Sequence, residues 1–180
     1  MTRPATAGDP DAQRLEHVEV WIGGLSRAQL LAELSSRAVQ LNAHAETLLE
    51  SEAFEHRPAR RVVLTERTVA EPGFADGASL SGILSAAQEQ GFLLCPTDAG
   101  PYLRLTLQAQ AASRDSAMSS GRAPDGALTV ASAPTSHDDE YPKGFYLRVV
   151  DGRAWLRGYR CDDEHRWAPE DRFAFQDAPS

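Results

Sequence analysis

Apolar and polar residues alternate at period two in several short segments of the chain, and apolar residues recur at helical spacing in others. Alternation of this kind is typical of strands that bury one face in a core. Val18, Val20 and Ile22, for example, share one side of a predicted strand, and Glu19 and Trp21 share the other. The pattern predicts strands over residues 17–24, 61–67, 92–95, 101–108, 127–133 and 172–176.

Three helices are predicted, and each begins at a residue that can cap a helix. Ser26, Asn42 and Ser79 can accept hydrogen bonds from the first backbone N–H groups of the segments that follow them. Gly91 follows the third helix, where a left-handed residue ends many helices. The first two helices form a helical hairpin or one bent helix. The apolar stripes are Leu30, Leu31, Leu34, Ala38 and Leu41, then Ala45, Leu48, Leu49 and Ala53, then Leu80, Ile83, Leu84 and Ala87.

The order of these elements predicts an α+β fold. About three helices in the N-terminal half pack on a largely antiparallel, curled sheet that ends in a β-hairpin. Residues 15–177 form a single domain, and residues 1–14 are polar and small enough to form a disordered tail. Residues 109–126 are rich in Ala, Ser and Gly, and we expect a low-complexity, mobile loop there.

The segment GFYLRVVDGRAWLRGYR, residues 144–160, predicts a hairpin closed by Asp151 and Gly152. A two-residue type I′ turn needs positive φ at both positions, which Asp-Gly tolerates. The resulting register gives the hairpin one ordinary core face. The other side, which we call the hairpin face, alternates arginine with aromatic rings: Tyr146, Arg148, Arg153, Trp155, Arg157 and Tyr159.

Two interpretations of the hairpin face stay open, an intramolecular ladder that shields the sheet and a platform for a ligand or partner. Guanidinium groups stack on aromatic rings in either case. As a platform, the face would stack a planar group and neutralise its phosphate or carboxylate. The leading hypothesis is a non-enzymatic binding or interaction module without a cofactor, whose partner is a protein or a small anionic or planar ligand. Pairing of an exposed hairpin with its own copy is a weaker alternative.

Two acidic clusters flank the hairpin, in the runs SHDDEYP and CDDEHR. Imidazoles and carboxylates can bind a divalent metal or supply acid and base groups. The alternative function is therefore a metal-assisted hydrolase, although the spacing matches no metal motif and such runs also form solvated turns. Neither His17 nor His56 has an evident partner. The candidate ligands are His137, Asp139, Asp163 and His165.

Composition narrows the choice of function class. The net charge of −8 opposes tight nonspecific binding of nucleic acid. No segment has the core of a secretory signal or the length of a membrane helix, so we expect a cytoplasmic protein that does not enter membranes.

Cys95 and Cys161 fit neither a zinc site nor a disulfide framework and predict buried thiols. P-loop, GxGxxG, GxSxG, HExxH and CxxC motifs are all missing from the sequence.

Three segments, LLCPTDAGPYLRL (93–105), GFYLRVVDGRAWLRGY (144–159) and RFAF (172–175), resemble a family of small uncharacterised bacterial proteins. Members share an LCP…GP.LRL segment, and some share a PKGFYLR..DG..WLRGY hairpin. Some are labelled helicase, but this chain has no nucleotide-binding loop and too few residues for helicase domains. The resemblance implies no activity, so no functional residue is carried over from it.

Overall fold

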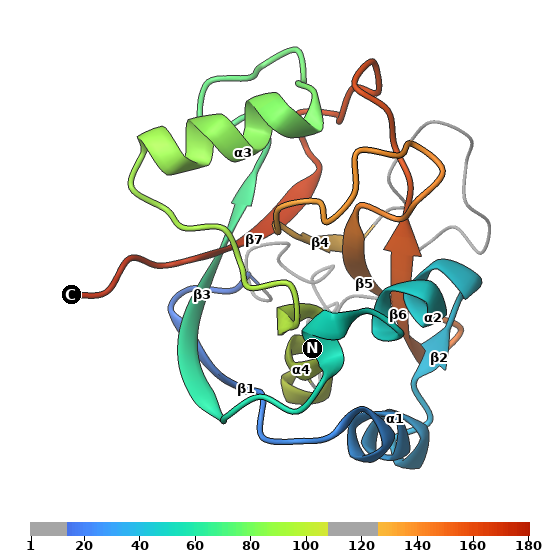
Figure 1. The fold of residues 1–180 in the computed structure, drawn as a ribbon. Coiled ribbons are helices and arrows are strands. Elements are labelled where there is room, and N and C mark those ends of the chain that lie inside the picture. The colour runs from blue at the N-terminus through green and yellow to red at the C-terminus, as the bar shows by residue number, and fades with distance from the viewer. Residues whose placement is uncertain (1–13, 108–125) are drawn as a thin grey trace, which may run out of the picture.

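The computed structural model describes residues 14–107 and 126–180, and this part of the chain has an α+β fold (Figure 1). The predicted 1–14 tail and 109–126 loop lie almost entirely outside the described residues. None of the described helices is long and apolar enough to cross a membrane. The elements are β1 (Val18–Ile22), α1 (Arg27–Ser36), β2 (Gln40–Leu41), α2 (Ala43–Leu49), a 3₁₀ helix (Glu52–Phe54), β3 (Arg60–Thr68), α3 (Leu80–Glu89), α4 (Ala99–Thr106), β4 (Leu128–Val130), β5 (Gly144–Val150), β6 (Arg153–Tyr159) and β7 (Arg172–Gln176).

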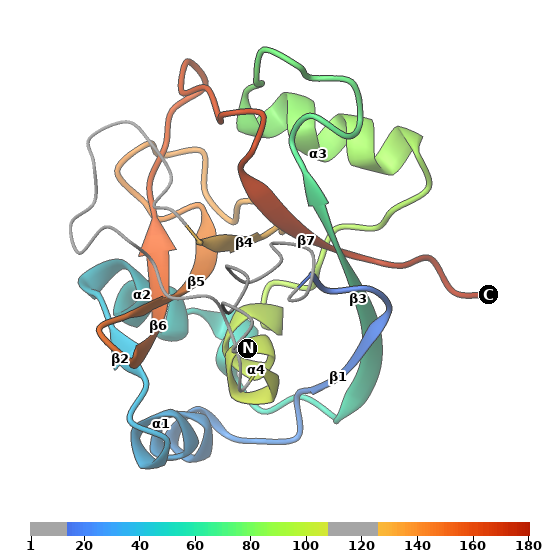
Figure 2. The same cartoon turned by 180° about the vertical axis from the view of Figure 1, so that it is seen from behind.

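The seven described strands form one curled, mixed sheet in the order β1-β3-β7-β4-β5-β6-β2 (Figures 1 and 2). Neighbours are antiparallel except for β4–β7 and β2–β6, which are parallel. The prediction of a largely antiparallel sheet is therefore only partly right. A parallel pair needs a long crossover, and the hairpin and the segment after it supply one between β4 and β7. The strand predicted at 92–95 is reduced to a bridge between Leu93 and Gln176.

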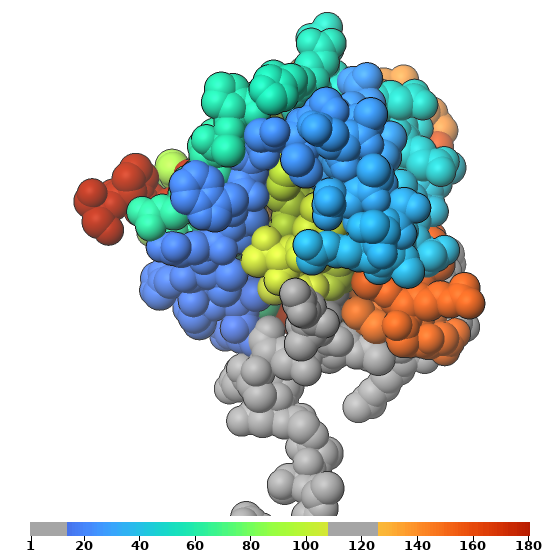
Figure 3. All heavy atoms as spheres, turned by 90° about the horizontal axis from the view of Figure 1, so that it is seen from below, coloured from blue at the N-terminus to red at the C-terminus, as the bar shows by residue number. Residues whose placement is uncertain are grey.

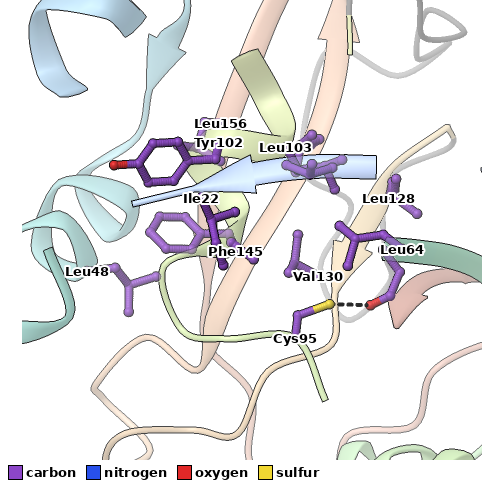
Figure 4. Packing of buried hydrophobic residues seen from close by; sticks show 14 of the residues in the cluster. Ile22, Leu48, Leu64, Cys95, Tyr102, Leu103, Leu128, Val130, Phe145 and Leu156 are labelled. Carbon is purple, nitrogen blue, oxygen red and sulfur yellow. Dashed lines mark hydrogen bonds between the residues drawn. The ribbon is translucent and has the colours of Figure 1, made fainter. Parts of the chain in front are cut away.

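Helices α1, α2 and α4 cover one face of the sheet. They contribute Leu34, Leu49 and Leu103 to a cluster that also holds Phe145 and Leu147 of β5. Figure 4 shows part of this first core cluster from close by. Viewed from below, α4 lies between β1 and α1, and the hairpin reaches the surface beside them (Figure 3). Burial of these side chains supplies the main driving force for folding.

The opposite face of the sheet carries a second core cluster. Ile83 and Ala87 of α3 pack there with Phe173 and Phe175 of β7, and Trp167 from the segment before β7 joins them. The strict alternation in β7 explains this division, because Ala174 belongs to the first cluster while its two neighbours belong to the second. The sheet is thus buried on both sides over much of its area.

The three predicted capping residues are confirmed. Ser26, Asn42 and Ser79 each accept a hydrogen bond from a backbone N–H three residues later, at 2.9–3.2 Å. The first two helices are nevertheless separated by β2. The prediction of one bent helix or a simple helical hairpin is therefore wrong. Ala38 has a φ of 55° just after α1, and β2 then pairs with β6 before α2 begins.

The strand predicted over 101–108 is wrong, because residues 99–106 form α4. Alternating leucines favoured the strand, but Pro101 lies in the first turn of the helix, where its missing N–H has no partner to lose. Gly100 lets α4 approach the sheet closely, since an added Cβ would lie 2.8 Å from the Phe145 side chain. Tertiary packing here overrides the local alternation.

Candidate functional site

The predicted hairpin forms with the predicted turn and register. Asp151 and Gly152 connect β5 to β6 with φ angles of 50° and 73°, which suit a type I′ turn. Arg148 lies opposite Trp155, and the neighbouring pairs follow the same register. The sequence therefore identifies correctly which side chains share each side of the hairpin.

Part of the hairpin face is buried. The prediction that the whole face is an exposed platform is therefore wrong. Tyr146, Arg148 and Tyr159 are only 3%, 1% and 5% exposed. Both tyrosines belong to the second core cluster, where the Trp167 ring packs edge-on against Tyr159 with 5.4 Å between ring centres. The segment between β6 and β7 returns over this side of the sheet. Alternation reveals the two sides of a strand but not what covers each side.

Arg153, Trp155 and Arg157 stay at the surface near the turn, and we call these three residues the β6 strip. Arg153 is exposed, and the other two are half-buried. The guanidinium carbon of Arg157 lies 4.9 Å from the centre of the Trp155 ring. Its Nε donates a hydrogen bond to the Tyr146 hydroxyl at 2.8 Å. The strip therefore presents an indole ring and a guanidinium group whose relative placement is already fixed.

Burial controls the chemistry of the Tyr146 hydroxyl, which anchors the strip. It raises the pKa of Tyr146, and the nearby positive charge of Arg157 offsets only part of that effect. The phenol therefore keeps its proton at neutral pH and accepts the Arg157 hydrogen bond as a neutral group. The Arg157 guanidinium is therefore held by a neutral oxygen in this contact.

The two acidic clusters form turns stabilised by their own aspartates. Asp138 Oδ1 accepts a hydrogen bond from the backbone N–H of Glu140 at 3.0 Å. Asp162 Oδ1 accepts two, from the N–H groups of Glu164 and His165 at 3.0 and 2.8 Å. Aspartate commonly closes turns in this way. The solvated-turn interpretation of these runs thus has direct structural support.

A lysine ammonium group lies inside the first cluster. Lys143 is 8% exposed, and its Nζ donates to the carbonyl oxygens of Ser136 and Asp138 at 3.1 and 2.9 Å. A carboxylate oxygen of Asp139 lies 3.9 Å from the same nitrogen. The Lys143 ammonium group is thus surrounded by oxygen atoms of this loop. Its positive charge offsets part of the negative charge of the first acidic cluster.

The four candidate metal ligands are not gathered into one site. Within residues 14–107 and 126–180, no group of three or more His, Cys, Asp or Glu side chains is placed to hold a metal ion. The His165 ring instead packs edge-on against Trp167, with 5.2 Å between ring centres. Of the candidates His137, Asp139, Asp163 and His165, the first three are exposed and the last is half-buried.

The two cysteines are free thiols in different surroundings. Cys95 is buried, as predicted, and its Sγ–H donates to the carbonyl oxygen of Ala174 at 3.2 Å (Figure 4). Cys161 is only half-buried, so the prediction of two buried thiols holds for one of them. Burial raises the pKa of Cys95 to about 12 and that of Cys161 to about 11. Neither thiol is activated as a nucleophile, because thiolates carry that reactivity.

His17 has partners that sequence reasoning missed. Its Nδ1 lies 2.6 Å from a carboxylate oxygen of Asp177, and the Thr65 hydroxyl donates to the same oxygen at 2.9 Å. A histidine, a carboxylate and a hydroxyl also occur in hydrolases. Thr65 is fully buried, however, and cannot reach a substrate. The three groups connect the end of β7 to the strands beside it. They are too far apart in the sequence for a local pattern to reveal this contact.

A hollow of about 270 Å³ between α3 and the ends of β3 and β7 is a further feature that the sequence did not reveal. Three phenylalanines, Phe92, Phe173 and Phe175, line it together with Ile83 and Ala87 of α3. Helical periodicity assigns the two α3 residues to a core-facing side. Periodicity does not show that the facing elements leave space between them.

The chain matches no known protein-family model, no curated protein and no solved structure. The family resemblance drawn from its three segments stays a prediction.

Proposed function

We propose that the protein is a non-enzymatic binding module that holds an acidic segment of a partner protein on the β6 strip. The contact of Arg157 with the Trp155 ring and the Tyr146 hydroxyl supports this proposal. Holding the guanidinium in place before binding lowers the conformational entropy that association must overcome. Trp and Arg are also the residues on which binding energy most often concentrates.

The charge of the strip favours a carboxylate-bearing partner. Arg153 and Arg157 lie four positions apart on the same side of β6, and a guanidinium pairs with a carboxylate through two parallel hydrogen bonds. The net charge of −8 argues against a long polyanion such as nucleic acid. A short acidic segment needs only the local positive charge of the strip.

The metal-assisted hydrolase has less support among the described residues. The carbonyl oxygens beside the first acidic cluster accept hydrogen bonds from Lys143, and Asp162 closes a turn. Both clusters thus have structural roles in their own turns, and the candidate ligand His165 packs against Trp167. We therefore retain the binding module as the proposed function.

Selection from a random-peptide library on immobilised protein tests the proposal. We expect the selected peptides to be enriched in Asp and Glu. The double variant Arg153→Ala/Trp155→Ala should bind them about tenfold more weakly, which corresponds to the loss of one strong contact residue. Trp21→Ala is the matched control, because Trp21 is 64% exposed on the distant strand β1.

The control variant should bind the selected peptides as the unmodified protein does, and both variants should keep the native circular dichroism spectrum. Selection of no acidic peptide would contradict the proposal. Equal binding to the double variant would contradict it as well, because the peptides would then contact another surface.

A further inference from the structure

One side of the sheet is open to solvent at the end formed by β1 and β3. Trp21 lies opposite Arg61 and Glu19 lies opposite Val63, and the alternation of strand residues places all four side chains on this side. Phe175 of β7 lies further along the same side and is buried in the second core cluster with residues of α3. Helix α3 therefore covers only part of this side of the sheet.

The chain after β7 forms the second wall of an open groove here. The backbone N–H of Asp177 donates to the carbonyl oxygen of Val63 at 2.8 Å, and the chain then runs on past β3 (Figures 1 and 2). The space between residues 177–180 and the strands, which we call the β1–β3 groove, measures about 700 Å³. Ligand sites in proteins commonly measure about 300–1,000 Å³. The groove is thus large enough for a ligand of several linked rings.

The polar side chains of the groove are accessible to a ligand. Arg61 and Glu19 are 56% and 58% exposed, and Nη1 of Arg61 donates to Oε1 of Glu19 at 2.7 Å. Within the described part of the chain, this contact leaves the second carboxylate oxygen and further guanidinium N–H groups for a ligand. The His17 side chain is 75% exposed, and its Nδ1 contacts Asp177, so Nε2 is the ring nitrogen that a ligand can reach.

The charges in the groove favour an uncharged ligand. The carboxylates of Glu19 and Asp177 line the groove together with the guanidinium of Arg61. An anionic ligand would be repelled by the two carboxylates, and a cationic ligand would be repelled by the guanidinium. Hydroxyl groups avoid both conflicts, because each can donate to a carboxylate or accept from a guanidinium. A ligand rich in hydroxyl groups therefore matches the polar lining.

Trp21 supplies an apolar surface at the end of the groove. It is 64% exposed, although tryptophan is highly buried on average. It lies directly opposite Arg61, which lines the groove. A pyranose ring carries C–H groups on its faces and hydroxyl groups around its edge, and burial of those C–H groups against an indole ring is favourable. One sugar unit can therefore pack on Trp21 while its neighbour bonds to Arg61 and Glu19.

A sugar chain fits this groove better than a peptide does. The apolar lining comes from small side chains such as Val63, Ala178 and Pro179, whereas grooves that recognise peptides contain pockets for larger side chains. Sheet faces bind oligosaccharides in other folds. We propose that the β1–β3 groove binds an uncharged oligosaccharide, at a site separate from the β6 strip.

Titration of ¹⁵N-labelled protein with neutral oligosaccharides, followed by NMR, tests this site. The probes are maltohexaose, cellohexaose, xylohexaose, mannohexaose and the hexamer of N-acetylglucosamine. At least one of them should shift the Trp21 indole N–H signal saturably, with a dissociation constant of about 1 mM or below. The Trp155 and Trp167 signals should not move. Hexagalacturonate, which carries a carboxylate on each unit, should bind more weakly than the best neutral probe.

Trp21→Ala should raise the dissociation constant of the best neutral probe at least about tenfold, as expected for loss of the ring on which a sugar packs. Trp21→Phe keeps an aromatic ring and should raise it less. Trp155→Ala is the matched control, because β6 lies far from β1 in the order of the sheet. Its affinity for the probe should stay within about twofold of that of the unmodified protein.

Three results would overturn the proposal: no saturable binding of any neutral probe, tighter binding of hexagalacturonate than of every neutral probe, or a shift at Trp155 in place of Trp21. Full affinity in Trp21→Ala would overturn it too. If Trp21→Ala does not fold, the position of the shifted signal in the unmodified protein decides the question. Acidic peptides are detected at Trp155 and sugars at Trp21, so each proposal can fail without the other.

Discussion

Glu66 of β3 and Arg172 of β7 form a two-pronged ion pair between neighbouring strands. Arg172 donates from Nη2 to Oε2 of Glu66 at 3.0 Å and from Nε to the other carboxylate oxygen. Glu66 is 3% exposed, and its Oε2 also accepts a hydrogen bond from the backbone N–H of Leu15 at 3.2 Å. The pair joins the start of the described chain to two strands of the sheet.

Neutralising Glu66 should therefore destabilise the protein. Glu66→Gln leaves the Arg172 cation without its counter-charge in a largely buried position, and we expect the free energy of unfolding to fall by about 2–3 kcal/mol. Glu19→Gln is the matched control in the exposed Glu19–Arg61 pair and should cost less than about 1 kcal/mol. Urea unfolding measures both changes. Equal losses in the two variants would contradict the assigned burial.

The hairpin turn gives a second prediction. Gly152 has a φ of 73° and nothing within 4 Å of an added Cβ, so Gly152→Ala changes backbone strain alone. We expect a loss of about 1 kcal/mol in the free energy of unfolding. Asp151→Asn should be nearly neutral, because Asn-Gly suits the same turn. Thermal and urea unfolding test both variants, and a neutral Gly152→Ala would argue against a type I′ turn.

Lys143 gives a third prediction. Lys143→Met removes the ammonium group that bonds to the carbonyl oxygens of Ser136 and Asp138, so those buried contacts are lost. The free energy of unfolding should fall by about 2 kcal/mol. Arg160→Met breaks the exposed Arg160–Glu140 pair and should cost less than about 1 kcal/mol. A larger loss in Arg160→Met than in Lys143→Met would contradict this ranking.

Alkaline pH should weaken the fold through Cys95. Its pKa rises from an ordinary value of 9.0 to about 12 on burial, so above pH 9 the unfolded state loses a proton that the folded state keeps. The stabilisation is complete below pH 9 and is lost as the pH rises from 9 to about 12. One such group changes the free energy of unfolding by up to about 1.4 kcal/mol per pH unit.

Urea unfolding at pH 8 and pH 10.5 measures this loss. In Cys95→Ala the decline over this interval should be smaller than in the unmodified protein. Burial also raises the pKa of Tyr159, so a part of the decline should remain. An identical decline in the variant and the unmodified protein would show that the Cys95 thiol does not titrate differently on folding.

The parts of the fold that local patterns encode could be predicted from the sequence. The capping residues, the Asp151-Gly152 turn and the hairpin register each depend on residues a few positions apart, and the structure confirms them. α4 could not be predicted in this way. Its leucines fit a strand pattern, its buried Ala99, Tyr102 and Leu103 fit a helical one, and tertiary packing decides between the two.

The candidate site shows the same division between local and distant interactions. Tyr146 and Arg157 were placed correctly on one side of the hairpin, but the burial of Tyr146 depends on the chain that returns after β6. The pairing of His17 with Asp177 joins residues that are 160 positions apart, and the hollow beside α3 joins residues 67–92 to β7. Such contacts follow from topology, which local patterns along one sequence leave undetermined.

Contact of the β6 strip with an acidic peptide can be observed directly at its tryptophan. Trp21 is 64% exposed, Trp155 is half-buried and Trp167 is 5% exposed, so three indole N–H signals report on three different places. Titrating a selected acidic peptide into ¹⁵N-labelled protein should shift the Trp155 signal saturably and leave the other two unchanged. An unmoved Trp155 signal, in the presence of bound peptide, would contradict a partner-binding role for the strip.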